Sequence, residues 1–134
     1  MITEQEYFNS TVKKVLTQIG CIMNISITVI DHSILKNSKE ALGICWKDKF
    51  NIYSITIDEF FVHECYTYFV LDSITSTWEL NGQTLEMVIC HELAHIQQWN
   101  HCKKHDRLTC ELYDMVEKPD KYYQYLKKEM EKIA

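Results

Sequence analysis

The first twenty residues carry apolar side chains at the spacing of a helix with one buried face. These residues are Phe8, Val12, Val15, Leu16 and Ile19. Just before them, Thr3 and Glu6 stand three residues apart, which is the arrangement of a capping box at the start of a helix. Gly20 follows the apolar series as a stop signal. The pattern predicts an amphipathic helix that ends near Gly20.

Alternation with a period of two replaces the helical spacing after Gly20 and predicts strands. Apolar residues alternate there with Ser26 and Thr28. Two further β-rich runs, 41–46 and 50–57, are joined by a short polar segment, which favours a hairpin. We therefore expect three strands in this half of the chain, forming a small antiparallel sheet.

Helical spacing returns after the expected hairpin. Asp58 can cap a helix that runs to about Leu71, although residues 66–70 would also suit a strand. Thr84 is the expected N-cap of a helix over 85–99, along which apolar residues form one stripe. Two more helices are predicted over 106–117 and 122–133.

The length and composition fit one domain that spans residues 1–134. Of the 134 residues, 46% are hydrophobic, which is enough to build one buried core. A helix, three strands and then several helices is an order typical of an α+β fold.

The net charge, the hydrophobic pattern and the cysteines indicate which partners and which cellular compartment to expect. The formal net charge of -5 argues against a surface that grips nucleic acid on its own. No stretch approaches the roughly eighteen apolar residues that a membrane span requires, and the N-terminus lacks the pattern of a signal peptide. Six cysteines without a CxxC pair are typical of reduced thiols. We therefore expect a cytoplasmic protein without a membrane partner.

The helix over 85–99 carries the chemistry, because it contains His91-Glu92-Leu93-Ala94-His95. Histidines four residues apart on a helix differ by about 40° in azimuth and about 6 Å in rise, so both can reach one ion. Neutral imidazole is a preferred ligand of Zn²⁺. Glu92 would flank the metal and would act as general base on a water bound to it. The motif predicts a hydrolytic zinc site.

A catalytic zinc needs a third protein ligand as well as an open position. His101 has the spacing of the third metzincin ligand, but Gln98 stands where that motif has the glycine that turns the chain. If the helix continued, His101 would lie about 240° round from His95. His105 follows a polar stretch long enough to loop back. His105 is therefore the favoured third ligand, with His101 as the alternative.

The fourth position separates an enzyme from a binding module. If Cys102 or Cys110 filled it, the zinc would be structural and the chain a catalytically silent zinc-binding interaction domain. If water filled it, the chain would be an enzyme. A further alternative is a metzincin-like protease with His101 as third ligand, for which Met115 is a poor candidate for the methionine turn.

The motif and its surroundings resemble the SprT-like, or Spartan-type, zinc metallopeptidase domain, over roughly residues 16–116. The likeness departs from the family pattern at Asp106, where the family commonly has Gly, and at Thr109, where it has an aromatic residue. No C-terminal zinc ribbon is expected, since the sequence has no CxxC pair. The residues that carry the likeness are 41–45, 52–55, 85–95, His105, Leu112 and Tyr113.

The resemblance implies a zincin-like fold, in which a small sheet packs with helices that include the motif helix. It also implies a cytosolic or nuclear metalloendopeptidase that acts on DNA-associated or DNA-crosslinked proteins. DNA is then a partner that helps to activate the enzyme, and Zn²⁺ is its cofactor.

Overall fold

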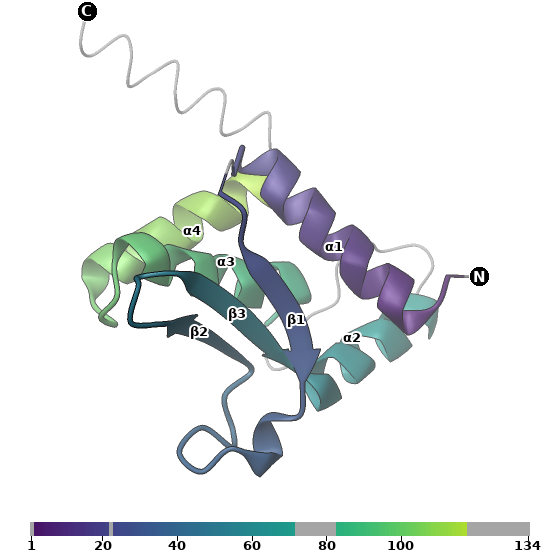
Figure 1. Ribbon diagram of the computed structural model, residues 1–134. Coiled ribbons are helices and arrows are strands. Elements are labelled where there is room, and N and C mark those ends of the chain that lie inside the picture. The colour runs from purple at the N-terminus through teal and green to yellow at the C-terminus, as the bar shows by residue number, and fades with distance from the viewer. Residues whose placement is uncertain (1, 22, 72–82, 118–134) are drawn as a thin grey trace, which may run out of the picture.

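The computed structural model describes residues 2–21, 23–71 and 83–117 (Figure 1). Within these ranges the chain forms helices and strands, which confirms the expected α+β class. In chain order the elements are α1 (Glu4–Gln18), β1 (Ser26–Ile30), the short 3-10 helix η1 (His32–Ile34), β2 (Gly43–Lys47), β3 (Tyr53–Asp58), α2 (Glu59–Leu71), α3 (Leu85–Gln97) and α4 (Lys103–Glu117).

The sheet is mixed, so the expectation of an antiparallel sheet is wrong. Strands β2 and β3 form the predicted antiparallel hairpin, whereas β1 pairs with β3 in parallel, with Ile27 opposite Ile55. The strand order is β1-β3-β2. Segment 31–42 carries the chain from one edge of the sheet to the other, and β3 then returns between the two edge strands in the direction of β1.

The helices confirm most of the sequence-based expectations. In the capping box, Thr3 Oγ1 accepts from the backbone N–H of Glu6 and Glu6 Oε1 accepts from that of Thr3, both at 3.1 Å. Residues 66–70 belong to α2, so the strand alternative is wrong there. The expected helix over 122–133 lies outside the described residues. In the part of the chain that is described, no helix has the length and apolar character needed to cross a membrane.

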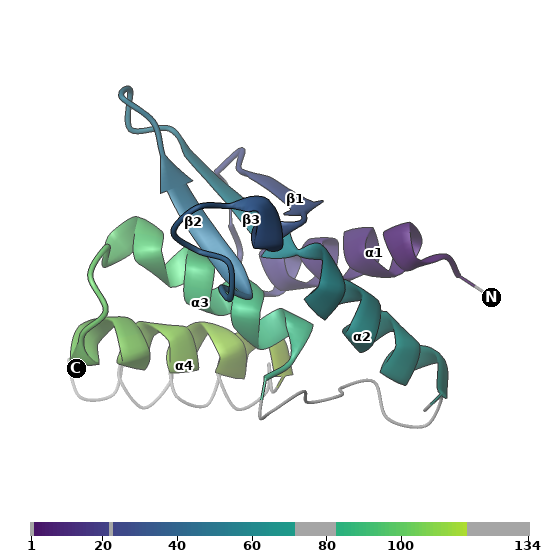
Figure 2. The same cartoon turned by 90° about the horizontal axis from the view of Figure 1, so that it is seen from below.

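Helix α3 lies between the sheet and α4, as Figure 2 shows. It contacts β2, β3, α1 and α4. Because it is covered on several sides, nine of its thirteen residues are buried. The apolar core that it shares with the sheet and the other helices includes Phe8, Val15, Ile55, Ile57, Phe61, Val62, Val88, Ile89 and Leu93. Packing on several sides therefore holds the motif helix, and the side chains on it, in a defined position.

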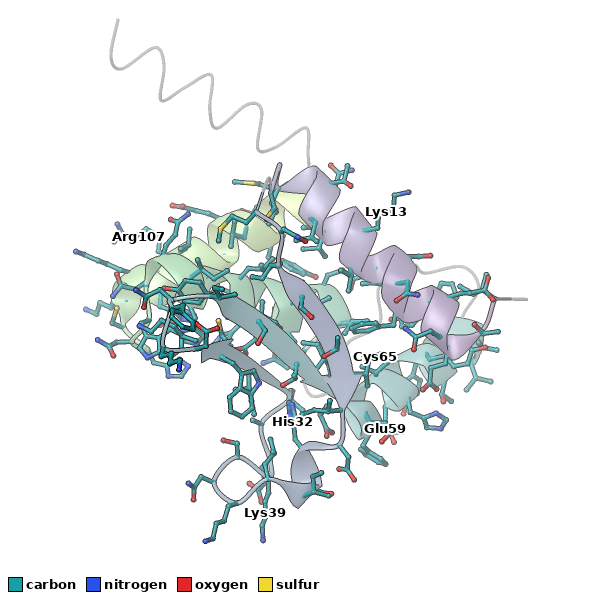
Figure 3. The ribbon with its side chains drawn as sticks, in the orientation of Figure 1. Lys13, His32, Lys39, Glu59, Cys65 and Arg107 are labelled. Carbon is teal, nitrogen blue, oxygen red and sulfur yellow. The ribbon has the colours of Figure 1, made fainter. Side chains whose placement is uncertain are left out.

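A fully buried histidine ties segment 31–42 to the sheet (Figure 3). The Nδ1–H of His32 donates to the carbonyl oxygen of Ala41 at 2.6 Å, so its Nε2 accepts from the Thr56 hydroxyl at 2.9 Å. The Trp46 Nε1–H donates to the same Thr56 oxygen at 2.8 Å. The backbone N–H of His32 donates to Asp58 Oδ1 at 3.0 Å. These bonds fix the backbone that leads into β2, beside the pocket described below.

Candidate metal centre

Helix α3 begins and ends at defined residues. Thr84 caps its start, with its Oγ1 accepting from the backbone N–H of Met87 at 3.0 Å. The helix ends at Gln97, and Gln98 is extended, with φ -134° and ψ 90°. The backbone N–H of Gln98 still donates to the carbonyl oxygen of Ala94 at 2.9 Å. The chain therefore leaves the helix sharply without a left-handed residue.

Three imidazoles converge beside this helix. The Nε2 of His101 lies 3.1 Å from the Nε2 of His95 and 3.3 Å from the Nε2 of His91. A tetrahedral zinc with Zn–N bonds of about 2.0–2.1 Å sets its ligand nitrogens about 3.3–3.4 Å apart. Both the donor type and the spacing therefore fit a zinc ion. Within residues 2–21, 23–71 and 83–117, this is the only group of His, Cys, Asp or Glu side chains with such a metal-binding arrangement.

His101 reaches this cluster because the chain turns at Gln98. His101 is the less favoured ligand in the sequence because a continued helix would carry it away from His95 and because Gln98 stands where a glycine would turn the chain. The extended conformation of Gln98 needs no positive φ, so glutamine is tolerated there. The turn can thus return His101 to the side of α3 on which the imidazoles of His91 and His95 lie.

His105 packs against His95 but does not belong to the group of three donor histidines. Helix α4 begins at Lys103 rather than at residue 106, which places His105 in its first turn, fully buried. Its Nε2–H donates to the carbonyl oxygen of His91 at 2.9 Å, so this nitrogen is not free to bind a metal. Its ring stacks on that of His95, with centroids 4.0 Å apart. The structure thus brings together His91, His95 and His101, and does not add the favoured ligand His105.

Hydrogen bonding and burial keep two of the imidazoles in the form that binds metal. The Nδ1–H of His95 donates to the carbonyl oxygen of Trp99 at 2.9 Å, which leaves Nε2 as the unprotonated donor. Burial, with a smaller contribution from His105, lowers the pKa of His95. Burial and the neighbouring histidines lower the pKa of His91 to about 4. At neutral pH both side chains are therefore uncharged, so neither must lose a proton to bind a metal.

Glu92 is a buried carboxylate at the edge of the cluster. Its side chain is 5% exposed, and its Oε2 lies 3.9 Å from the Nε2 of His91. Burial raises the pKa of Glu92 to about 7, against the opposing effect of a backbone hydrogen bond from Cys45. A carboxyl group with such a pKa can both accept and release a proton near neutral pH.

Gly43 is a site residue that the sequence analysis missed. A Cβ atom on Gly43 would stand 2.9 Å from Cγ of Glu92 and 2.9 Å from Cγ1 of Val88. The glycine therefore lets β2 approach the motif helix beside Glu92. A signal was present, because a glycine inside a β-rich run often marks the close approach of another element.

Replacing Gly43 by alanine should push β2 away from Glu92. We expect a loss of roughly 1–3 kcal/mol in the free energy of unfolding, typical of overpacking. The side chain of Glu92 should also be displaced, with zinc content retained. Denaturant unfolding measures the loss of stability, metal analysis measures the zinc content, and a structure of the variant shows the position of Glu92.

Gly20→Ala is the matched control. It adds the same methyl group at φ 67°, where no atom lies within 4 Å. It should cost stability through backbone strain and leave the metal centre unchanged. A Gly43→Ala variant with wild-type stability and an undisplaced Glu92 would contradict the packing argument.

A pocket of about 630 Å³ opens onto the imidazoles and Glu92. Strand β2, an edge strand of the sheet, borders it along residues 43–45. The pocket is lined by Ser38, Ala41, Leu42, Gly43, Ile44, Cys45, Gln83, Val88, His91, Glu92, His95, Trp99, Asn100 and His101. The candidate metal centre therefore lines an open cleft that the edge strand β2 borders.

Neither cysteine considered as a structural ligand joins the cluster. Cys102 and Cys110 are both exposed, and the three-membered donor group contains only histidines. Three histidines with room for water form a ligand set typical of catalytic zinc, whereas structural zinc is usually closed by four protein ligands.

Comparisons with models of protein families, with curated proteins and with solved structures found no match. The likeness to SprT-like domains stays an expectation, carried by the residues of the motif helix and the hairpin.

Proposed function

We propose that this protein is a zinc-dependent metalloendopeptidase of the SprT-like kind. In this proposal His91, His95 and His101 hold the metal, and Glu92 is the general base. The observation that carries it is the convergence of the three Nε2 atoms, at 3.1 and 3.3 Å, beside a buried carboxylate.

The chemistry follows from the placement of Glu92. A zinc ion held by the imidazoles would polarise the scissile carbonyl and lower the pKa of a water molecule at the open position. The Glu92 carboxylate would take a proton from the water as the water oxygen attacks the carbonyl carbon. When the C–N bond breaks, the same carboxyl group hands that proton to the leaving amine.

The strand edge beside the pocket favours a polypeptide as substrate. An edge strand presents unpaired backbone donors and acceptors, to which an extended peptide can pair. Residues 43–45 of β2 border the pocket. The backbone N–H of Cys45 already bonds Glu92, and a peptide paired to the rest of this edge would pass over the metal centre. The narrower expectation of DNA-associated or DNA-crosslinked proteins rests on the resemblance alone.

The inclusion of His101 also favours one alternative, a metzincin-like protease. The spacing from His91 to His101 matches that motif, and the two donor atoms lie 3.3 Å apart. However, Gln98 makes the turn in an extended conformation. Met115 lies within α4 and not in a turn. The agreement with that class is therefore limited to the ligand spacing.

Metal content and proteolysis test the proposal together. The purified protein should hold about one zinc per chain and cleave an unfolded protein, with and without single-stranded DNA. A chelator should stop cleavage and added zinc should restore it. A protein that neither holds zinc nor cleaves any of these substrates would refute the assignment.

A further inference from the structure

The turn between β2 and β3 exposes large apolar side chains. Phe50 is 72% exposed and Ile52 is 62% exposed, at the tip of a hairpin that projects from the body of the molecule (Figure 2). Lys47 is the last residue of β2, and Lys49 lies in the turn. Exposed apolar residues gathered beside cations are typical of an interaction surface.

The backbone of this turn is held by its own hydrogen bonds. Asp48 Oδ1 accepts from the backbone N–H of Phe50 at 2.7 Å and from that of Ile52 at 3.0 Å. The backbone N–H of Asn51 donates to the Asp48 carbonyl oxygen at 3.1 Å. The Asp48 carboxylate keeps its negative charge while it binds backbone groups, so with Lys47 and Lys49 this part of the hairpin carries one net positive charge. Phe50 and Ile52 are thus displayed from an ordered backbone, which reduces the entropy lost on binding.

Aromatic and cationic side chains continue from the turn to the pocket. The Nζ of Lys47 lies 4.7 Å from the centroid of the Trp99 ring, and the ring of Tyr53 lies 6.2 Å from that of Trp99. Trp99 is 44% exposed and lines the pocket. We name this surface the hairpin strip, and it consists of Lys47, Lys49, Phe50, Ile52, Tyr53 and Trp99.

We propose that the hairpin strip docks an extended, acidic and apolar segment of the polypeptide substrate, outside the metal centre. The inference rests on the proposed peptidase function, because the strip leads into the pocket where the chain would be cut. Carboxylates of the segment would meet Lys47 and Lys49, and its apolar side chains would cover Phe50 and Ile52.

The small positive charge favours a polypeptide over a nucleic acid at this strip. Phe50 and Trp99 could stack on bases, so the aromatic content does not distinguish the two partners. Two lysines can neutralise only a few phosphates, whereas affinity for nucleic acid grows with the number of phosphate contacts. Two lysines do suit a segment that carries one or two carboxylates.

The test measures peptide binding to the Glu92→Gln variant, which should bind the peptide without cleaving it. The probe is a labelled, unstructured peptide of Asp, Glu, Leu and Phe, compared by fluorescence anisotropy with a peptide in which Lys replaces every acid. The acidic peptide should bind more tightly, and Phe50→Ser or Lys49→Glu should weaken it about tenfold. Phe60→Ser, at a residue on α2 that is 69% exposed, and Lys13→Glu on α1 are the matched controls and should not change binding.

Each other outcome overturns the docking proposal. Equal binding of the two peptides, or no effect of the hairpin substitutions, would remove the strip as a polypeptide surface. Binding of oligo(dT) in place of the acidic peptide, lost in the same hairpin variants, would assign the strip to nucleic acid. Because no bond is cut in this assay, failure of the peptidase proposal would appear separately, as a lack of hydrolysis by the wild type.

Discussion

Glu92→Gln should lower peptide hydrolysis by about a hundredfold to ten-thousandfold, the usual effect of losing a general base. The amide can still bond to water but cannot take its proton at neutral pH. Glu92 lies outside the donor group of three histidines, so the variant should retain one zinc per chain. Initial rates of cleavage and metal content, measured on the same preparations, give both quantities.

Glu86→Gln is the matched control for this result. Glu86 lies on the same helix and is 5% exposed, as Glu92 is, but it pairs with Lys14 at 3.8 Å and does not line the pocket. Its substitution should leave hydrolysis nearly unchanged. If the wild type and Glu92→Gln cleave at the same rate, the activity comes from another site or a contaminant. A zinc-loaded but inactive wild type would favour the catalytically silent zinc-binding domain.

His91→Ala, His95→Ala and His101→Ala should each abolish tight zinc binding, because two remaining imidazoles cannot complete the site. His105→Gln should keep the zinc. The amide nitrogen of glutamine can replace the Nε2–H that His105 donates to the His91 carbonyl oxygen. Zinc content after dialysis against a weak chelator is the measurement.

Folding must be checked in the same series, because His105 is fully buried. The circular dichroism of each variant at the assay temperature shows whether lost zinc reflects lost ligands or lost structure. A folded His105→Gln that loses zinc, together with His101→Ala that keeps it, would restore the ligand choice made from the sequence.

Local patterns predicted the elements that carry the site but not how the chain connects them. The motif helix and the hairpin follow from periodicity and capping, and both are present. The parallel pairing of β1 with β3 was not predictable, because alternation of apolar residues is the same in either strand direction. The ligand choice depended on Gln98, whose extended φ and ψ no residue pattern signalled.

His32, which fixes the segment beside the pocket, and Gly43 depend on contacts between distant parts of the chain. His32 bonds to Thr56, 24 residues away, and nothing near His32 indicates that partner. The glycine at position 43 signals a close approach of some element, but only the packed structure shows that this element is the motif helix at Glu92 and Val88. Periodicity describes which face of one element is buried, whereas these contacts depend on which two elements meet.

In the proposed site, the placement of His101 would couple metal binding to the stability of the fold. Two candidate ligands belong to α3 and the third lies in the linker that leads to α4 (Lys103–Glu117), so an ion bound by all three would join the two helices. A ligand that binds only the folded state raises the free energy of unfolding by about 4.1 kcal/mol when its free concentration is 1,000 times its Kd. The melting temperature should therefore rise with the free zinc concentration, so the fraction of folded protein at a given temperature would depend on the zinc supply.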